Sequence, residues 1–172
     1  AGPAGSGSRP WKTAEPRDVF LYMEREIVKS LGYHLAEGFA SKRESTEIEL
    51  VERVWAIDRA NEVTLDDIYD ALSHNYPEYA GVEEKIKAIE LESERNLTEK
   101  NKIIHSVYQK ALKLGKKVIF ASDIYLPRQH METILADAGY AEYEKLYVSN
   151  EIGCNKASGS MFTYILNDIG VQ

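Results

Sequence analysis

The chain has 172 residues, of which 44% are hydrophobic and 28% are charged, a composition typical of a globular protein. Its formal net charge of −7 argues against a protein that binds nucleic-acid phosphates, because such binding needs clustered lysine and arginine. A chain of this length can bury a core without disulfides or a structural metal.

Cysteine content and hydropathy bear on the expected cellular location and on membrane association. Cys154 is the only cysteine, so no disulfide can form within the chain, and we expect a cytoplasmic location. No apolar run approaches the roughly 18 residues that a membrane span requires, so we expect no membrane partner. Cys154 has no histidine nearby in sequence, which favours an inert thiol over a nucleophile.

The first 15 residues are predicted to be a disordered leader. They begin with AGPAGSGS, which lacks the hydrophobic stretch of a signal peptide and resembles a tag-derived segment. We therefore base the fold prediction on the residues that follow.

Residues 16–114 have the hydrophobic spacing of helices almost throughout. Apolar residues recur at helical intervals from Val19 to Leu31, where Gly32 predicts a stop, and a second helix is expected from about residue 34 to residue 60. The TLDD sequence at 64–67 is a capping box that predicts the start of a short helix.

The remainder of this helical region is interrupted at Pro77, and Gly81 precedes a further long helical stretch. Thr98 is expected to cap a helix that ends at Gly115. The charge-rich run over 83–102 reads as a solvated helix face with some ion pairs between neighbouring turns.

Residues 115–172 alternate strand and helix. The apolar run over 117–122 predicts a strand buried on both faces, followed by a helix over 128–138, a strand over 145–149 and a helix over 158–169. Short connections of this kind imply a parallel sheet. The predicted fold class is therefore α/β and α-rich: a helical cap-like region over 16–114 beside a partial Rossmann-like core over 115–172 with about two parallel strands.

A two-stranded sheet has a consequence for assembly. Its unpaired edge is a template for another strand, so we expect either a homodimer through the exposed sheet edge or helices, or a core that helices cover.

Polar residues that could bind an anion follow the two predicted strands. Ser122 ends the first strand and Asp123 follows it, and Lys156 comes after the second strand, before a predicted helix start. Ligands of open parallel sheets bind beyond the carboxyl ends of the strands. A hydroxyl, backbone N–H groups of residues 123 or 124 and a lysine together indicate a phosphate-binding half-site.

The phrases VIFASDIYLP and LYVSNEIGCNKASGSMF resemble the second and third motifs of the haloacid dehalogenase (HAD) superfamily of hydrolases. The resemblance extends to a branch of predicted hydrolases with a helical cap, since RDVF and VTLDDIY within 16–69 are similar to that cap. It implies that Ser122 binds a substrate phosphoryl group, that Lys156 neutralises it and holds the nucleophile, and that Asp123 offers its backbone N–H more than its carboxylate.

The resemblance also implies parts that this sequence lacks. The Asp-x-Asp motif that carries the nucleophile is expected near residue 10, where the sequence reads GSGSRPW, and the acidic pair that holds Mg²⁺ is expected beyond Gln172. Asp18 and Asp168 are poor substitutes, so no metal ligand is assigned in this chain. The sequence is therefore expected to be a fragment of a Mg²⁺-dependent phosphatase that acts on a phosphorylated small molecule, and to be nearly inactive alone.

Other interpretations stay open. Ser122 can be a strand end, Asp123 a turn residue and Lys156 a solvated lysine. The chain can be a non-catalytic helical interaction or linker module of a larger enzyme, or a receiver-like domain with Asp123 as phosphate acceptor. The four histidines show no metal-ligand spacing, and the 11 tyrosines are expected to pack in the core or on the cap.

Overall fold

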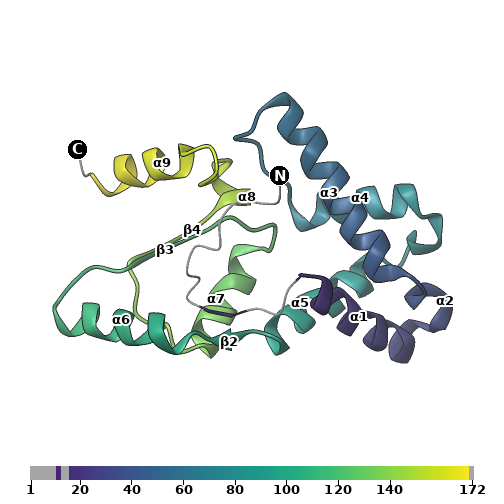
Figure 1. Cartoon of the computed structure of the whole chain (residues 1–172), viewed down its shortest axis with the longest axis horizontal. Helices are drawn as coiled ribbons and strands as arrows, with labels where there is room; N and C mark the ends of the chain where they lie inside the picture. Colours follow the sequence, from purple (N-terminus) through teal and green to yellow (C-terminus); the bar gives the residue numbers. More distant parts are fainter. Residues whose placement is uncertain (1–10, 13–15, 171–172) are drawn as a thin grey trace. The chain divides into compact units, whose positions relative to one another are not determined.

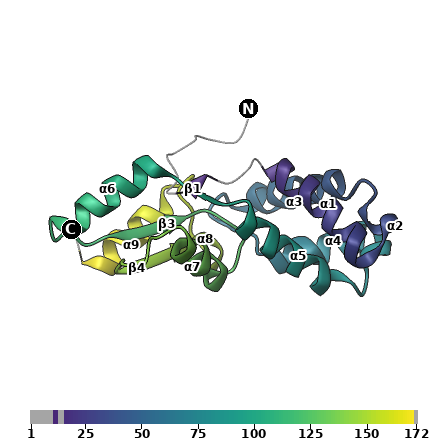
Figure 2. The same ribbon diagram turned by 90° about the horizontal axis from the view of Figure 1, so that it is seen from below.

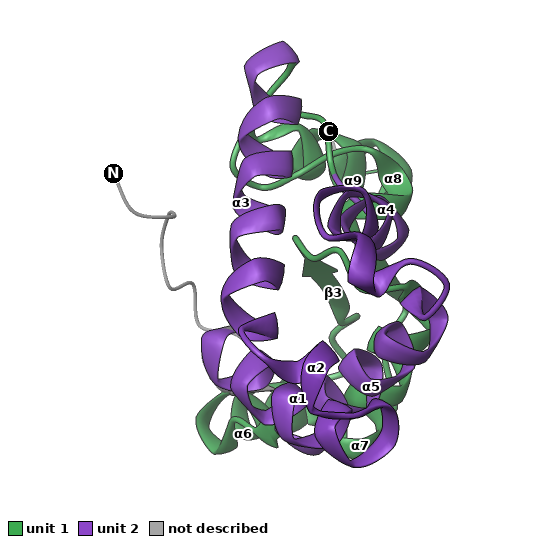
Figure 3. Cartoon of the chain, turned by 90° about the vertical axis from the view of Figure 1, so that its right-hand side faces the viewer, with its two compact units in different colours: residues 1–12, 58–62, 99–172 green, residues 13–57, 63–98 purple. Residues whose placement is uncertain are grey.

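The computed structural model describes residues 11–12 and 16–170. They form two compact units, coloured separately in Figure 3. Of the described residues, unit 2 comprises 16–57 and Val63–Thr98, and unit 1 comprises Trp11–Lys12, the loop Asp58–Glu62 and residues 99–170. The division differs from the predicted boundary at residue 114, because the loop and the helix after residue 101 pack with the sheet.

Unit 2 is helical, as the sequence predicts. Its elements are α1 (Pro16–Leu31), α2 (Tyr33–Ala36), α3 (Phe39–Ile57), α4 (Leu65–Asn75), the 3₁₀ helix η1 (Pro77–Tyr79) and α5 (Glu83–Asn96). Gly38, with φ of 69°, separates α2 from α3, so the single helix predicted over 34–60 is wrong. The predicted capping box is confirmed: the Thr64 hydroxyl accepts the Asp67 N–H, and the Asp67 carboxylate accepts the Thr64 N–H.

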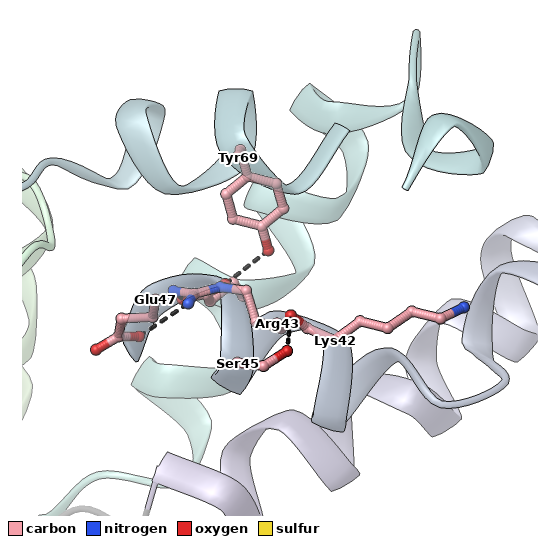
Figure 4. Close-up of polar contacts among 6 residues, drawn as sticks. Lys42, Arg43, Ser45, Glu47 and Tyr69 are labelled. Carbon is pink, nitrogen blue, oxygen red and sulfur yellow. Dashed lines mark hydrogen bonds and ion pairs between the residues drawn. The ribbon is translucent and has the colours of Figure 1, made fainter. Parts of the chain in front are cut away.

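A fully buried ion pair between Arg43 and Glu90 lies in the core of unit 2. Figure 4 shows its Arg43 together with Glu47 and Tyr69. The Arg43 guanidinium of α3 binds both carboxylate oxygens of Glu90 of α5, with Nε–Oε2 at 3.0 Å and Nη2–Oε1 at 2.7 Å. The Tyr69 hydroxyl donates to Glu90 at 2.6 Å, and Glu47 accepts from Arg43 Nη1 at 2.8 Å. The prediction that the charged run over 83–102 is a solvated face is therefore wrong for Glu90, whose side chain is buried.

Unit 1 is an α/β structure with two small sheets (Figures 1 and 2). Its elements are β1 (Trp11–Lys12), β2 (Glu99–Lys100), α6 (Lys102–Lys113), β3 (Ile119–Ser122), α7 (Arg128–Asp137), β4 (Lys145–Val148), α8 (Ser149–Ile152) and α9 (Ser160–Ile169). β1 pairs antiparallel with β2, and β3 pairs parallel with β4. The α-rich α/β fold class with two parallel strands is confirmed.

Three details of unit 1 differ from the sequence prediction. Two residues of the expected leader form β1, whereas the rest of that leader lies outside the described residues. Asn101 caps α6 by accepting the N–H groups of the first helical residues, whereas the Thr98 hydroxyl donates to the Glu94 carbonyl. β3 is only partly buried along most of its length and not buried on both faces.

Helices cover both faces of the β3–β4 sheet. On one face, Tyr108 of α6 and Phe120 of β3 pack against Tyr140, which is fully buried. On the other face, Met161 and Ile165 of α9 form a buried cluster with Tyr147. These contacts hold the helices against the two strands and so help to position the residues that follow each strand.

Candidate functional site

The predicted site residues lie at the carboxyl ends of β3 and β4. Ser122 pairs with Val148 in the parallel register, so the chain leaves both strands at the same edge of the sheet. Residues 123–124 follow the first strand, and Ser149 follows the second. This edge is where open parallel sheets bind ligands.

Ser122 has a hydroxyl that is available to a ligand. The residue is 8% exposed at the end of β3. Within the part of the chain that the structure describes, its hydroxyl has no hydrogen-bond partner. The Ser122 hydroxyl can therefore donate a hydrogen bond to a ligand at this edge.

Lys156 is held beside Ser122. Its backbone N–H donates to both carboxylate oxygens of Asp123, at 3.1 and 3.0 Å, and its ammonium lies 3.3 Å from the carbonyl oxygen of Ala121. Among the described acidic side chains none forms an ion pair with this ammonium. The structure thus brings Ser122, Asp123 and Lys156 together.

Three details of the expected anion site differ from the sequence analysis. The carboxylate of Asp123, and not only its backbone, takes part in the arrangement, because it holds the backbone of Lys156. The Ile124 N–H is committed to the Ser149 hydroxyl at 3.0 Å. In addition, α9 begins at Ser160, four residues after Lys156, so this lysine is not part of the first helical turn.

Several polar residues around the site were not predicted. Asn150 donates from Nδ2 to the carbonyl oxygens of Ile124 at 2.8 Å and Leu126 at 2.9 Å, which fixes the chain after β3. Asn155, 1% exposed, donates to the Arg59 carbonyl at 2.7 Å. Both residues follow β4 in sequence. Their position beyond the end of a strand is the sequence feature that could have indicated a role at the site.

Glu62 is the second carboxylate at this edge. Its Oε2 accepts a hydrogen bond of 2.7 Å from the Ser149 hydroxyl. Burial raises the pKa of Glu62, hydrogen bonds from Ser149 and Asn155 partly offset that rise, and the nearby charge of Asp123 adds to it. No sequence pattern indicated this residue, because it comes from the loop between α3 and α4.

The described residues do not fit the Mg²⁺ that the resemblance implies. Among them, no group of three or more histidine, cysteine, aspartate or glutamate side chains could hold a metal ion. Asp123 and Glu62 accept hydrogen bonds from Lys156 and Ser149, respectively. No step of the chemistry below therefore depends on a metal held by these residues.

Asp168 has a role in packing. Its Oδ2 accepts hydrogen bonds of 2.6 Å from both the Lys145 ammonium and the Tyr147 hydroxyl, which ties α9 to β4. The Lys145 hydrogen bond, followed by that of Tyr147, lowers the pKa of Asp168. Burial, followed by the hydrogen bond to Asp168, raises the pKa of Tyr147 to about 12.

We expect the Tyr147 hydroxyl to ionise near pH 12. In an Asp168→Asn variant the same hydroxyl should ionise at lower pH, because the Asp168 charge that raises its pKa is removed. The pKa of Tyr147 in the folded chain lies above the ordinary tyrosine value of about 10, so the stability that this phenol contributes is complete below about pH 10 and is lost as the pH rises toward about 12. Nuclear magnetic resonance titration of ring-labelled tyrosine measures the Tyr147 midpoint in the unmodified chain and in Asp168→Asn. A Tyr147→Phe variant assigns the resonance. A Tyr147 midpoint near 10 in the unmodified chain would contradict the expectation.

The outer edge of β4 carries a pocket of about 350 Å³, lined in part by Arg128, Tyr143, Tyr147 and Asp168. Arg128 donates from Nη1 to the Leu146 carbonyl at 2.5 Å, so its guanidinium covers part of the strand edge. This pocket contains none of the three predicted site residues. The candidate site is therefore the carboxyl edge of the sheet.

Comparisons with protein-family models and with curated proteins find no match to this sequence. Within the described residues, no helix is both long enough and apolar enough to cross a membrane.

Proposed function

We propose that this chain supplies the phosphate-binding half of a HAD-like phosphohydrolase site, with Ser122 and Lys156 as the binding groups. One observation carries the proposal: the Lys156 ammonium lies 3.3 Å from the Ala121 carbonyl, directly before Ser122, at the carboxyl edge of a parallel sheet. The resemblance of the strand-SDIYLP phrase to the HAD family supports the same role. The proposed substrate class is a phosphorylated small molecule.

The binding chemistry follows from the two side chains. The Ser122 hydroxyl donates a hydrogen bond to a phosphoryl oxygen, and the Lys156 ammonium neutralises charge on a second oxygen. Asp123 positions Lys156 by accepting its backbone N–H, which fixes the lysine backbone while the ammonium remains able to turn toward the anion. A site of this kind orients a phosphoryl group and reduces its repulsion of an attacking anion.

In this proposal the attacking carboxylate is neither Asp123 nor Glu62. Asp123 and Glu62 are the carboxylates that those contacts bring to the edge, and both accept hydrogen bonds from protein groups. We therefore propose that hydrolysis belongs to a larger phosphatase, in which a carboxylate and the Mg²⁺ implied by the resemblance complete the site. A cytoplasmic location, suggested by the single cysteine, is part of the same proposal.

Lys156→Ala should weaken binding of inorganic phosphate by roughly ten- to hundredfold, the loss expected for one charge-assisted hydrogen bond. Isothermal titration of the whole chain measures this. Lys117→Ala is the matched control, because Lys117 is an exposed lysine that precedes β3 at the opposite end of the strand, where it pairs with Glu144. Equal affinities of the two variants would contradict the proposed site.

Turnover of an aryl phosphate, with and without Mg²⁺, tests the other half of the proposal. The unmodified chain should hydrolyse it no faster than Lys156→Ala does, because binding groups alone provide no covalent path. Mg²⁺-dependent turnover that the lysine variant loses would instead assign the nucleophile to a carboxylate of this chain.

A non-catalytic interaction module is the second candidate function. The observation that favours it is an apolar stripe along α6 and the residue that follows it. Ile103 and Val107 of α6 are 75% and 60% exposed, and Leu114, directly after α6, is 63% exposed. Light scattering on the chain would detect a homodimer built through this stripe or through the sheet edge. A chain that binds no phosphate but self-associates would favour this candidate over the first.

A further inference from the structure

The loop Asp58–Glu62 connects α3 to α4 of unit 2, yet it packs as part of unit 1. The loop has its own turn: the Ala60 N–H donates to the Asp58 side chain at 2.9 Å, and the Asn61 N–H donates to the Asp58 carbonyl at 3.1 Å. A short loop folded on itself can present its last residue, Glu62, in a defined position.

Glu62 holds the segment that follows β3 through one intermediate residue. The Ser149 side chain is completely buried and donates to Glu62 Oε2 at 2.7 Å. The same hydroxyl oxygen accepts the Ile124 N–H at 3.0 Å. Because a hydroxyl has only one proton, donation to Glu62 leaves its oxygen lone pairs for the Ile124 amide.

The loop is also fixed to the segment that precedes α9. The Asn155 side chain donates to the Arg59 carbonyl at 2.7 Å, and its Oδ1 accepts the Ser158 N–H at 2.8 Å. Asn155 directly precedes Lys156, whose backbone is in turn bound to Asp123. Both segments of the phosphate half-site are thus bonded to the same five-residue loop.

A carboxylate is an unfavourable neighbour for an anion site, so its presence needs a reason other than anion binding. Burial and, to a smaller extent, the Asp123 charge raise the pKa of Glu62, against the opposing hydrogen bonds from Ser149 and Asn155. What the carboxylate provides in return is the hydrogen bond that orients Ser149 and, through it, the chain after Ser122.

We propose that Glu62 is a positioning residue of the phosphate half-site: through Ser149 it sets the backbone that follows Ser122, so that the loop Asp58–Glu62 controls the geometry in which the anion binds. This inference rests on the proposed function for the identity of the ligand. The orientation of Ser149 and Ile124 by Glu62 is independent of that identity.

The test compares Glu62→Gln with Glu62→Ala in the whole chain. The glutamine oxygen can still accept the Ser149 hydrogen bond, whereas alanine removes the acceptor. We expect Glu62→Ala to speed amide exchange of Ile124 by roughly tenfold or more and to weaken sulfate binding by a similar factor. Glu62→Gln should keep the slow exchange and bind sulfate at least as tightly as the unmodified chain, because it removes a negative charge.

The two readouts separate the failure of this inference from failure of the proposed function. Slow Ile124 exchange in Glu62→Ala, with a thermal melt showing that the variant is folded, would overturn the positioning role whatever the ligand. Equal sulfate affinities of the alanine and glutamine variants would also overturn it, since charge alone would then explain the effect. A chain that binds neither sulfate nor phosphate would overturn the proposed function, while the exchange measurement would still decide the role of Glu62.

Discussion

Glu90→Gln should lower the free energy of unfolding by about 3–5 kcal/mol, the loss expected when one partner of a buried ion pair is removed. The Arg43 and Glu90 side chains are both 0% exposed, so the remaining guanidinium charge cannot regain water without unfolding. Arg43 also lies over the Phe20 ring, with 4.8 Å between guanidinium carbon and ring centroid, which leaves little room for another orientation. Urea unfolding followed by circular dichroism measures the change.

Glu78→Gln is the matched control for this result. Glu78 pairs with Lys42 in the same unit, but its side chain is 38% exposed. Exposed pairs typically contribute less than about 1 kcal/mol, because water replaces the lost partner. Similar losses in the two variants would mean that burial does not govern the strength of the Arg43–Glu90 pair.

Tyr140→Ala should destabilise unit 1 by about 3–5 kcal/mol, the range for removing a large buried aromatic side chain. The Tyr140 ring is fully buried and lies 5.1 Å from His105, 5.0 Å from Tyr108 and 5.5 Å from Phe120, measured between ring centroids. Edge-to-face contacts of this kind add to the hydrophobic contribution. Urea unfolding followed by near-ultraviolet circular dichroism reports on this aromatic cluster.

Tyr140→Phe separates the ring from its hydroxyl. The hydroxyl donates to the Asn101 carbonyl at 3.3 Å, a long hydrogen bond, so its removal should cost no more than about 1 kcal/mol. A loss in Tyr140→Phe as large as that in Tyr140→Ala would show that the hydroxyl, and not ring packing, holds α6 against the sheet.

Local sequence patterns predicted most of the fold. Helical spacing and the capping residues located α1 and α4, and the apolar run after Gly115 located β3, because these signals depend on residues close together in the chain. Burial of Glu90 could not be predicted in this way. A charged run has the same pattern whether it faces water or an arginine 47 residues away.

The candidate site was predictable in part for the same reason. Parallel pairing of two recognisable strands brings Ser122 and Lys156 to one edge. The contribution of Glu62 and Arg59 depends on contacts across 87 and 96 residues, with no motif in the loop to indicate them. The packing role expected for the tyrosines holds for Tyr108 and Tyr140, whose rings contact each other and His105.

The path of the chain between the two units affects the unfolded state. The chain passes from one unit to the other between residues 12 and 13, 57 and 58, 62 and 63, and 98 and 99. Each of the two stretches of unit 2 therefore starts and ends in unit 1, so unfolding of the helices alone would leave two closed loops and not free chain ends. For a disulfide that closes a loop of such length, the lowered entropy of the unfolded chain is worth about 4 kcal/mol. Anchoring by the loop Asp58–Glu62 thus acts on unit 2 as a cross-link without a covalent bond.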